Sequence, residues 1–194
     1  MSAITKTFIT EKEYIEKERK ALTKSEYYNG EVFAMAGASR YHNRIVASTI
    51  AAISQQLKNR SCHFYPSDLR VHNKLNTLYT YTDVIIVCGK EEYLDDEFDT
   101  LLNPTVLIEV LSPSTERYDR GEKFKLYRSI PSLENYVMIS STEVLAEVFT
   151  WMENNEWKLN LAKHKDDSIH ISAINNDLAL KDIYEQVGNF VKEK

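Results

Sequence analysis

Two nearly continuous apolar runs, each holding one carboxylate, constrain the fold of this chain more than any other feature. Residues 82–87 read Thr-Asp-Val-Ile-Ile-Val, and residues 105–111 read Thr-Val-Leu-Ile-Glu-Val-Leu. Apolar runs of this kind, rich in β-branched residues, are typical of strands that are buried on both faces. Such strands need other elements packed on each face of their sheet. We therefore expect an α/β fold with a buried central sheet.

Helix and hairpin signals surround these two strands. Thr10 and Glu13 form a capping box for a helix over residues 10–20, and Asn29-Gly30 predicts a tight hairpin within residues 26–35. An amphipathic helix follows Ser39 and carries His42 in its first turn. The remaining expected elements are a helix over residues 119–130, a short helix near 180–187, and strands at 61–65, 68–72, 136–139, 146–152 and 157–162.

The length and composition of the chain bound its class. The chain has 194 residues, of which 43% are hydrophobic and 27% charged, which is enough apolar content for a sizeable core and excludes a disordered chain. No internal repeat or Gly/Ser/Pro-rich linker divides it, so we expect residues 1–194 to form a single domain. The net charge of −5 argues against a protein that coats nucleic acid without specificity.

Cysteine use and hydropathy indicate the cellular compartment. Cys62 and Cys88 lie far apart and form no C-x-x-C pair, which excludes a cysteine-rich metal site and a disulfide-rich secreted scaffold. No apolar run approaches the length that spans a bilayer, and the N-terminal segment is charged from its start, unlike a signal peptide. We therefore expect a cytoplasmic protein with no membrane partner.

Several common enzyme motifs are absent from the sequence. It contains no G-x-S-x-G, H-E-x-x-H, G-K-[ST] or G-x-G-x-x-G stretch, so serine hydrolases, zincins, P-loop enzymes and dinucleotide-binding proteins lose their usual sequence support. The five histidines show no i, i+4 pair, which makes a histidine-rich zinc site a poor explanation.

The two carboxylates on the apolar strands are the strongest candidates for chemistry. Burying an ionised carboxylate costs several kcal/mol unless a cation or hydrogen bonds compensate it. A structural salt bridge would explain either Asp83 or Glu109 alone, but both together on consecutive strands favour a shared site for a hard cation such as Mg²⁺. Lys123 follows Glu109 by fourteen positions. It is either a solvated helix lysine or a group that holds water and offsets charge at that site, and taken alone the residue favours the solvated lysine.

Seven parts of the chain occur in an order known from one protein family. They are residues 26–31, His42, and residues 67–68, 82–87, 108–115, 118–127 and 133–137. The block E-V-L-S-P-S-T at 109–115, followed by D-R-G-E-K at 119–123, is highly specific. Over roughly residues 10 to 165 the chain resembles the Uma-two (Uma2) family of restriction endonucleases. This family is placed in the PD-(D/E)xK nuclease superfamily, so the resemblance implies an α+β fold with a restriction-endonuclease-like mixed β-sheet flanked by helices.

The resemblance also assigns roles to particular residues. Asp83 matches the strand aspartate of the superfamily, and Glu109 matches the glutamate of its E-x-K element. The chain departs from the pattern at Thr82, where the motif has proline, and at Leu111, where it has lysine. The family pattern suggests that the lysine has moved to the following helix, at Lys123. Catalytic competence then depends on whether Lys123 points toward the two carboxylates.

Further residues complete the implied site. In related nucleases an acidic residue from the first helix or its neighbourhood helps to bind metal, and Glu26 is the residue that would serve here. His42 would assist as a ligand or phosphate contact, or else it is a core histidine at its helix's first turn. Asp68 is either a further site carboxylate or a turn residue, and we favour the turn. Ser112 and Ser114 lack a paired base and are expected to shape the turn after their strand.

The function expected from these residues is metal-dependent hydrolysis of DNA phosphodiester bonds by an endonuclease. Mg²⁺ or Mn²⁺ would bind Asp83, Glu109 and the backbone carbonyl of Val110, with Lys123 orienting the attacking water. Locally basic residues would hold phosphates despite the negative total charge; they are Arg40, Arg44, Arg117, Arg120, Lys125 and Arg128.

Two other functions remain open, and so does the assembly. The chain could be a catalytically inactive nuclease fold that binds nucleic acid or protein, with Asp83 and Glu109 in structural ion pairs. The same chemistry could also hydrolyse a small phosphodiester. Members of such families often pair, and a homodimer suits cleavage of two strands, but no residue of this sequence demonstrates it.

Overall fold

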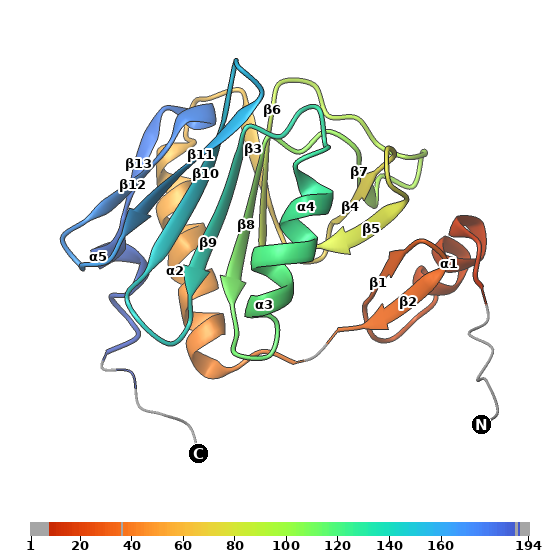
Figure 1. Ribbon diagram of the computed structural model, residues 1–194, viewed down its shortest axis with the longest axis horizontal. Helices are drawn as coiled ribbons and strands as arrows, with labels where there is room; N and C mark the ends of the chain where they lie inside the picture. The colour runs from red at the N-terminus through yellow and green to blue at the C-terminus, as the bar shows by residue number, and fades with distance from the viewer. Residues whose placement is uncertain (1–7, 36, 189, 191–194) are drawn as a thin grey trace.

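The computed structural model describes residues 8–35, 37–188 and 190 (Figure 1). The N-terminal residues 1–7, part of the segment judged unlike a signal peptide, lie outside the described residues. The helices are α1 (Glu11–Glu18), α2 (Arg40–Gln56), α3 (Glu116–Tyr118), η1 (Asp119–Lys123), α4 (Phe124–Tyr127), η2 (Ser172–Ile174) and α5 (Leu180–Ile183). The strands are β1 (Ser25–Tyr28), β2 (Glu31–Ala34), β3 (Cys62–Pro66), β4 (Arg70–Asn73), β5 (Leu78–Tyr81), β6 (Val84–Cys88), β7 (Thr100–Leu101), β8 (Val106–Leu111), β9 (Asn135–Ser140), β10 (Ala146–Met152), β11 (Glu156–Ala162), β12 (Ser168–Ile171) and β13 (Asn176–Ala179). Within the described part of the chain, no helix is long and apolar enough to cross a membrane.

The strands form mixed sheets, as the fold class requires. A six-stranded sheet has the order β11-β10-β9-β8-β6-β3, in which β8 and β9 are parallel and the other neighbours antiparallel. A five-stranded sheet has the order β2-β1-β5-β4-β7, and β12 pairs with β13. The chain passes from the five-stranded to the six-stranded sheet between β5 and β6. These mixed sheets with flanking helices confirm the expected fold class.

Helices cover both faces of the six-stranded sheet. In Figure 1, α2 lies against one face and the α3–η1–α4 helix against the other. All six residues of β8 are buried, and alternate side chains enter two cores. Ile108 and Val110 pack in the core that includes Ile45 and Ile53 of α2. Leu107 packs in the core that includes Tyr127 of α4, along with other residues of that face. The two apolar runs are therefore strands buried on both faces, as predicted.

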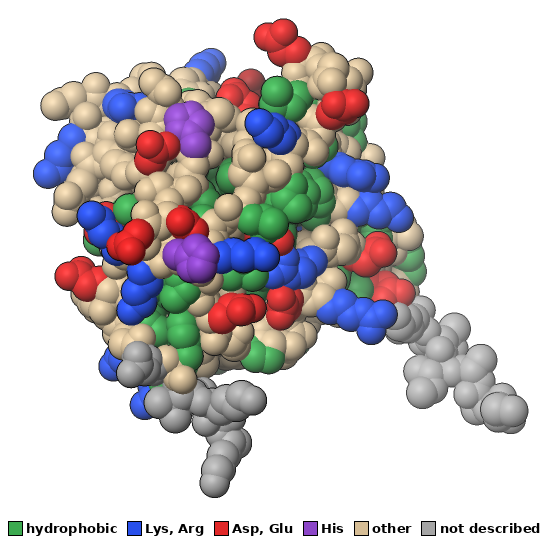
Figure 2. All heavy atoms as spheres, turned by 60° about the vertical axis from the view of Figure 1, so that its left-hand side comes forward, with side chains coloured by type: hydrophobic (Ala, Val, Ile, Leu, Met, Phe, Trp, Pro, Cys, Tyr) green, Lys and Arg blue, Asp and Glu red, His purple; other side chains and the backbone are tan. Residues whose placement is uncertain are grey.

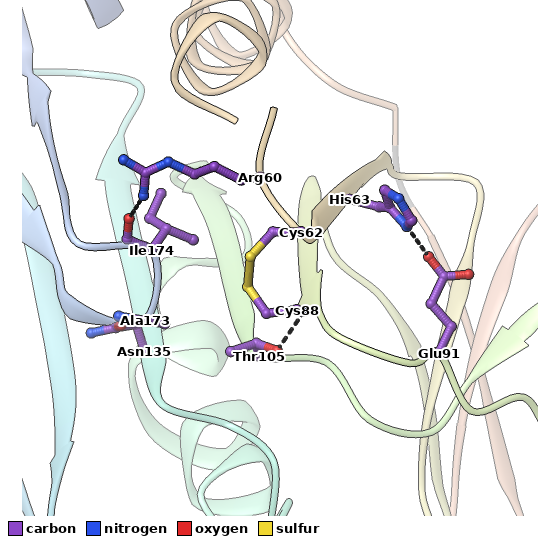
Figure 3. Close-up of a disulfide and its surroundings, with 9 residues drawn as sticks. All are labelled: Arg60, Cys62, His63, Cys88, Glu91, Thr105, Asn135, Ala173 and Ile174. Atoms are coloured by element: carbon purple, nitrogen blue, oxygen red, sulfur yellow. Dashed lines mark hydrogen bonds and ion pairs between the residues drawn. A yellow bond between two sulfur atoms is a disulfide. The ribbon is translucent and has the colours of Figure 1, made fainter. Parts of the chain in front are cut away.

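A disulfide joins the edge strand β3 to its single neighbour β6 (Figure 3). Cys62 and Cys88 are directly opposite each other in the antiparallel register, and the Gly89 N–H donates to the Ser61 carbonyl beside them. The two cysteines are 26 positions apart in the sequence. The sequence analysis did not pair these cysteines, because that spacing belongs to no motif and only the register of β3 and β6 brings them together.

The local signals in the sequence agree with the structure, apart from some boundaries and short strands. The capping box is formed: the Thr10 hydroxyl accepts from the Glu13 N–H, and the Glu13 carboxylate accepts from the Thr10 N–H. Asn29 and Gly30 have φ values of 47° and 87°, the left-handed backbone that a two-residue hairpin needs. The helix expected at 119–130 starts earlier, at Glu116. The strands not predicted are β5, β7, β12 and β13.

Candidate active site

The two strand carboxylates lie side by side at the ends of neighbouring strands. Val84 of β6 is opposite Ile108 of β8, so continuing this antiparallel register sets Asp83 opposite Glu109. The Val110 N–H donates to Asp83 Oδ2 at 2.7 Å. Asp83 therefore lies just before β6, and its side chain adds one more hydrogen bond between the β6 and β8 segments. Its side chain is partly exposed, whereas Glu109 is buried.

The five-stranded sheet supplies further polar groups to the same place. Glu26 of β1 is buried, and its Oε1 accepts a hydrogen bond of 2.5 Å from the Thr80 hydroxyl of β5. The chain then leaves β5 at Tyr81 and enters β6 at Val84, so the strand ends of the two sheets meet beside Asp83. This crossing brings Glu26 and Glu109, which lie in different sheets, to a common cation.

That cation is the ammonium group of Lys123, which projects from the helix covering β8. Its Nζ lies 2.9 Å from Glu26 Oε1, 2.9 Å from Glu109 Oε1 and 3.2 Å from the Tyr81 carbonyl oxygen. Asp119 Oδ1 is 3.8 Å away. Only 5% of Lys123 is exposed, so the solvated-helix alternative is wrong and the side chain points toward the carboxylates.

A wide turn of the helix aims Asp119 and Lys123 in one direction. Residues Asp119–Lys123 form a π-helical turn, η1, between the regular turns of α3 and α4. A π turn holds more residues than an α turn, so positions i and i+4 lie closer to one line along the axis. Both Asp119 and Lys123 are buried, and Gly121 lies between them in open space. Turns of this kind occur frequently at functional sites.

Burial and mutual charge govern protonation in the cluster. Burial raises the pKa of Glu109 well above its usual value, even though Lys123 opposes the shift. Burial likewise raises the pKa of Asp119. Burial alone would lower the pKa of Lys123, but Glu109 and the other anionic partners around it raise the pKa well above its usual value. Lys123 is therefore a protonated ammonium group and donates hydrogen bonds.

His42 lies beside Asp83 at the start of α2. Its Nε2 is 3.2 Å from Asp83 Oδ2, and its backbone N–H donates to the Ser39 hydroxyl that caps the helix. Its Nδ1 is buried without a hydrogen-bond partner among the described residues. The ring therefore contacts the aspartate, and both sequence interpretations describe part of its position: it is in the first turn of its helix and it faces the site.

The structure keeps three other sequence candidates out of the cluster. Asp68 has an 86% exposed side chain that pairs with Lys24, in agreement with the turn interpretation. Ser112 Oγ is 2.9 Å from Ser114 Oγ, and the Ser112 carbonyl accepts from the Glu116 N–H. The two serines therefore shape the turn between β8 and α3, as expected.

Sequence reasoning missed three groups that complete the cluster. Asp119 is buried one helical turn before Lys123, and the i, i+4 spacing in the D-R-G-E-K block was the signal for it. The Tyr127 hydroxyl donates to Glu109 Oε1 at 3.1 Å and lies 3.1 Å from the Thr80 hydroxyl. Tyr127 and Thr80 carry no local signal, because only the packing of the helix on both sheets brings them together.

The donor chemistry around Asp83 and Glu109 fits a hard divalent cation. Within residues 8–35, 37–188 and 190, no three His, Cys, Asp or Glu side chains are grouped so as to hold a metal ion. Mg²⁺, however, commonly takes one or two carboxylates and completes its shell with water and phosphate oxygens. In a strand the N–H and C=O of one residue face the same side, so the Val110 carbonyl faces the Asp83 edge. The contacts above involve Oδ2 of Asp83 and Oε1 of Glu109, and the second oxygen of each carboxylate takes no part in them.

Comparison with known proteins identifies the family. The sequence pattern of the Uma2 family, described as "Putative restriction endonuclease", matches residues 12–181. The chain belongs to the Uma2 family. The matched range includes Glu26, His42, Asp83, Glu109 and Lys123, and it confirms the resemblance seen in the sequence. Nuclease is the activity class that the description of the Uma2 family gives.

Two relatives and a solved structure are similar to this chain over most of its length. Uncharacterized protein slr1290 of Synechocystis sp. (strain PCC 6803) is 32% identical over 91% of this chain and 91% of its own length. Uncharacterized protein sll1609 of the same organism is 29% identical over 89% of this chain and 97% of its own. The crystal structure of a putative nuclease belonging to DUF820 from Anabaena variabilis superposes with a TM-score of 0.74 over 91% of this chain and 98% of the other. At 16% identity, that match shows a shared fold.

Proposed function

We propose that this Uma2 protein is an endonuclease that hydrolyses phosphodiester bonds in DNA with the help of Mg²⁺ or Mn²⁺. One observation carries the proposal: Asp83 and Glu109 are opposite each other at adjacent strand ends, and the Lys123 ammonium is 2.9 Å from Glu109. Two carboxylates that would hold a divalent cation, with a fixed ammonium group beside them, suit phosphodiester hydrolysis, because cations stabilise the negative charge that grows on the phosphate during the reaction.

The charge balance of the cluster supports a divalent cation. Three buried carboxyl groups, Glu26, Glu109 and Asp119, surround the single ammonium of Lys123, and Asp83 lies beside them. Burial raises the pKa values of Glu109 and Asp119, and the neighbouring carboxylates raise them further, against the opposing effect of the single positive charge. A divalent cation at the free oxygens of Asp83 and Glu109 would relieve this excess of negative charge and favour their ionised forms.

Each residue of the cluster has a role that follows from its contacts. Asp83, Glu109 and the Val110 carbonyl would hold the cation, which when bound supplies a Lewis acid and lowers the pKa of water. Lys123 is protonated and its three donors face partners inside the cluster, so it would offset negative charge at the site as a fixed cation and does not itself accept a proton. Glu26 fixes the Lys123 ammonium from the other sheet. Tyr127 orients Glu109, and His42 orients Asp83.

The surface charges allow a nucleic acid to approach in spite of the net charge of −5. Figure 2 shows acidic and basic side chains interspersed over one face of the molecule. Arg117 and Arg128 are exposed and form no ion pair within the described ranges, whereas Arg120 pairs with Glu116 and Glu147. Unpaired cations on the helix that carries Lys123 would hold phosphates, while Arg120 instead anchors the helix to β10.

The test is the cleavage activity of Glu109→Gln on supercoiled plasmid DNA with Mg²⁺ or Mn²⁺. We expect metal-dependent cleavage by the unaltered protein and none by Glu109→Gln, because glutamine has the shape of glutamate but is a poor ligand for a hard cation. Asp68→Asn, which neutralises an exposed carboxylate, is the matched control and should cut like the unaltered protein. Undiminished nicking by a folded Glu109→Gln variant, as checked by circular dichroism, would refute the proposal.

A second candidate function is a nuclease fold that binds nucleic acid or protein without cutting. The observation in its favour is that the Lys123 ammonium already pairs with Glu26 and Glu109 at 2.9 Å, in the manner of a structural ion pair. Titration calorimetry with Mn²⁺ separates the two functions. Heat of binding that disappears in both Asp83→Asn and Glu109→Gln supports the enzyme, and its absence in the unaltered protein supports the binding module.

A further inference from the structure

A shallow groove lies between the end of α4 and the tip of the β10–β11 hairpin, away from the carboxylate cluster. Its volume is about 470 Å³, within the range of sites that hold small organic groups. The lining residues are Lys125, Arg128, Ser129, Trp151, Asn155 and Trp157. Two indole rings and two cations thus line one hollow, and the mechanism proposed above uses none of them as catalytic groups.

The two tryptophans form a stacking surface that is open to solvent. Trp151 and Trp157 are directly opposite each other on β10 and β11, with ring centroids 5.4 Å apart and planes inclined by 56°. Trp157 is held in place by the edge of Phe124, whose ring lies 5.5 Å away. Trp151 remains 38% exposed. The Trp157 ring is therefore held against the core of this face, and the Trp151 ring offers its surface to a planar ligand.

The two cations of the groove have no anionic partner in the part of the chain that the structure describes. Lys125 and Arg128 are exposed, and neither forms an ion pair or side-chain hydrogen bond within residues 8–35, 37–188 and 190. By contrast, Arg120 on the same helix is paired with two carboxylates. Unpaired cations beside exposed aromatic rings complement a ligand that is planar, apolar on its faces and negatively charged at its edge.

We infer that this groove binds an unpaired base of a nucleic acid strand, with its adjoining phosphates on Lys125 and Arg128. The inference rests on the proposed function and names the form of nucleic acid that the protein engages. Aromatic side chains stack on bases only where the base faces are exposed, in a single strand or a base turned out of a duplex. Lys125 and Arg128 follow Lys123 on the same α3–η1–α4 helix, so one helix carries cations of the groove and the ammonium of the cluster.

Tryptophan fluorescence provides a direct test, because Trp151 and Trp157 are the only two tryptophans of the chain. The unaltered protein is titrated in EDTA, which prevents metal-dependent cleavage, with a twelve-residue single strand of thymidylate. We expect saturable quenching of the emission by base stacking. A fully paired twelve-base-pair duplex should quench much less. Quenching that is absent with the single strand, or equal with the duplex, would overturn the inference.

Substitutions in the groove identify the residues responsible, with binding followed by the polarisation of a labelled oligonucleotide. Trp151→Leu should weaken binding by roughly 5- to 150-fold, the loss expected for one stacked base, and Trp151→Phe should retain most of the affinity. The double substitution Lys125→Glu with Arg128→Glu should weaken binding further at low salt. Lys158→Glu is the matched control, because Lys158 is exposed next to Trp157 in sequence but on the opposite face of β11.

The outcomes separate this inference from the proposed function. If the groove variants bind and cut like the unaltered protein while Glu109→Gln is inactive, the inference fails and the nuclease stands. If the oligonucleotide quenches emission and the groove variants lose binding, but Glu109→Gln still cuts, the groove stands and the catalytic assignment fails. Trp151, Lys125 and Arg128 are exposed, so their variants should fold, and thermal unfolding curves verify this.

Discussion

Lys123 is the residue on which the candidate site depends. A lysine with 5% exposure is rare, because an ammonium group loses several kcal/mol of hydration on burial unless anions replace the water. Here Glu26 and Glu109 supply those anions from two different sheets. The interaction therefore fixes the ammonium group at the candidate site, and it joins the five-stranded sheet to the six-stranded one.

Replacing Lys123 by methionine should destabilise the protein by about 3–5 kcal/mol, because Glu26 and Glu109 would remain buried without a counter-charge. Urea unfolding at neutral pH measures this loss. Lys125→Met, two positions later on the exposed face of the same helix, is the matched control and should change stability by no more than about 0.5 kcal/mol. Equal stabilities of the two variants would show that the Lys123 interaction contributes nothing to folding.

The protonation of Glu109 predicts a pH dependence of stability. Burial raises the pKa of Glu109 in the folded protein, so the folded state binds a proton more tightly than the unfolded state. Its stabilising contribution is then complete below the unfolded pKa of about 4.3 and is lost as pH rises through the folded pKa. In EDTA, the unaltered protein should therefore lose stability relative to Glu109→Gln as pH rises above about 4.5, by up to about 1.4 kcal/mol per pH unit. Parallel stability curves of the two proteins between pH 4.5 and 8 would contradict this assignment.

At the scale of the element, the edge strand β3 depends on its covalent link. β3 has β6 as its single neighbour in the sheet, and the Cys62–Cys88 disulfide fixes that pairing. The chain between the two cysteines includes β4, β5 and Asp83, so the link closes the segment that carries one of the two strand carboxylates.

Removing this link should lower stability by about 3.5 kcal/mol, the loop-closure contribution expected for two cysteines 26 positions apart. The double variant Cys62→Ser with Cys88→Ser, compared with the unaltered protein in urea without reductant, measures the difference. Added dithiothreitol should bring the unaltered protein to the stability of the variant and leave the variant unchanged. A reductant effect on both proteins alike would show that it does not act through this disulfide.

Helices and turns that a local sequence motif encodes could be predicted. Strands that form only because a neighbouring strand pairs with them could not. The capping box at Thr10 and the Asn29-Gly30 turn are encoded within a few residues, and both are formed. The strand β7 has two residues and exists because it pairs with β4, which no local pattern reveals. The early start of the helix at Glu116 follows from hydrogen bonds to the Ser112 carbonyl, where the sequence instead showed a proline-containing turn.

The same distinction applies to the candidate site. Asp83 and Glu109 could be predicted as site residues because an ionised carboxylate is unusual in an apolar strand, where burial disfavours its charge. The place of Lys123 beside them was implied by the family pattern alone, and its direction depends on the π-helical turn of η1. Tyr127 and Thr80 look like ordinary core residues in the sequence, and the contact between two sheets and a helix gives them their hydrogen bonds.

At the scale of the whole molecule, the proposed binding of an anionic polymer by an acidic protein depends on a few local cations. The chain carries a net charge of −5, and the exposed cations of the α3–η1–α4 helix without an ion pair in the described residues are Arg117, Lys125 and Arg128. Each contact between a cation and a phosphate releases a counterion from the nucleic acid. Because the contacts are so few, each release would contribute a measurable part of the binding free energy.

We expect the association constant for a single-stranded oligonucleotide in EDTA to fall with salt, with a log–log slope of magnitude about 2–3, as three phosphate contacts imply. Polarisation titrations between 50 and 300 mM NaCl, roughly the range where such slopes are measured, determine it. The double substitution at Lys125 and Arg128 should reduce the slope by about 1.5. An affinity that does not change with salt would contradict phosphate binding by these cations.

The short passage from β5 to β6 also sets a limit on how this architecture can vary in length. Thr80 and the Tyr81 carbonyl serve the five-stranded side of the cluster, and Asp83 serves the six-stranded side. Successive strand residues alternate in direction, so one inserted or deleted residue here would turn Asp83 away from Val110 and shift the Tyr81 carbonyl from the ammonium. Surface loops elsewhere can lengthen at little cost in stability. The stretch from Thr80 to Asp83, in contrast, must keep its length for both sets of contacts to form.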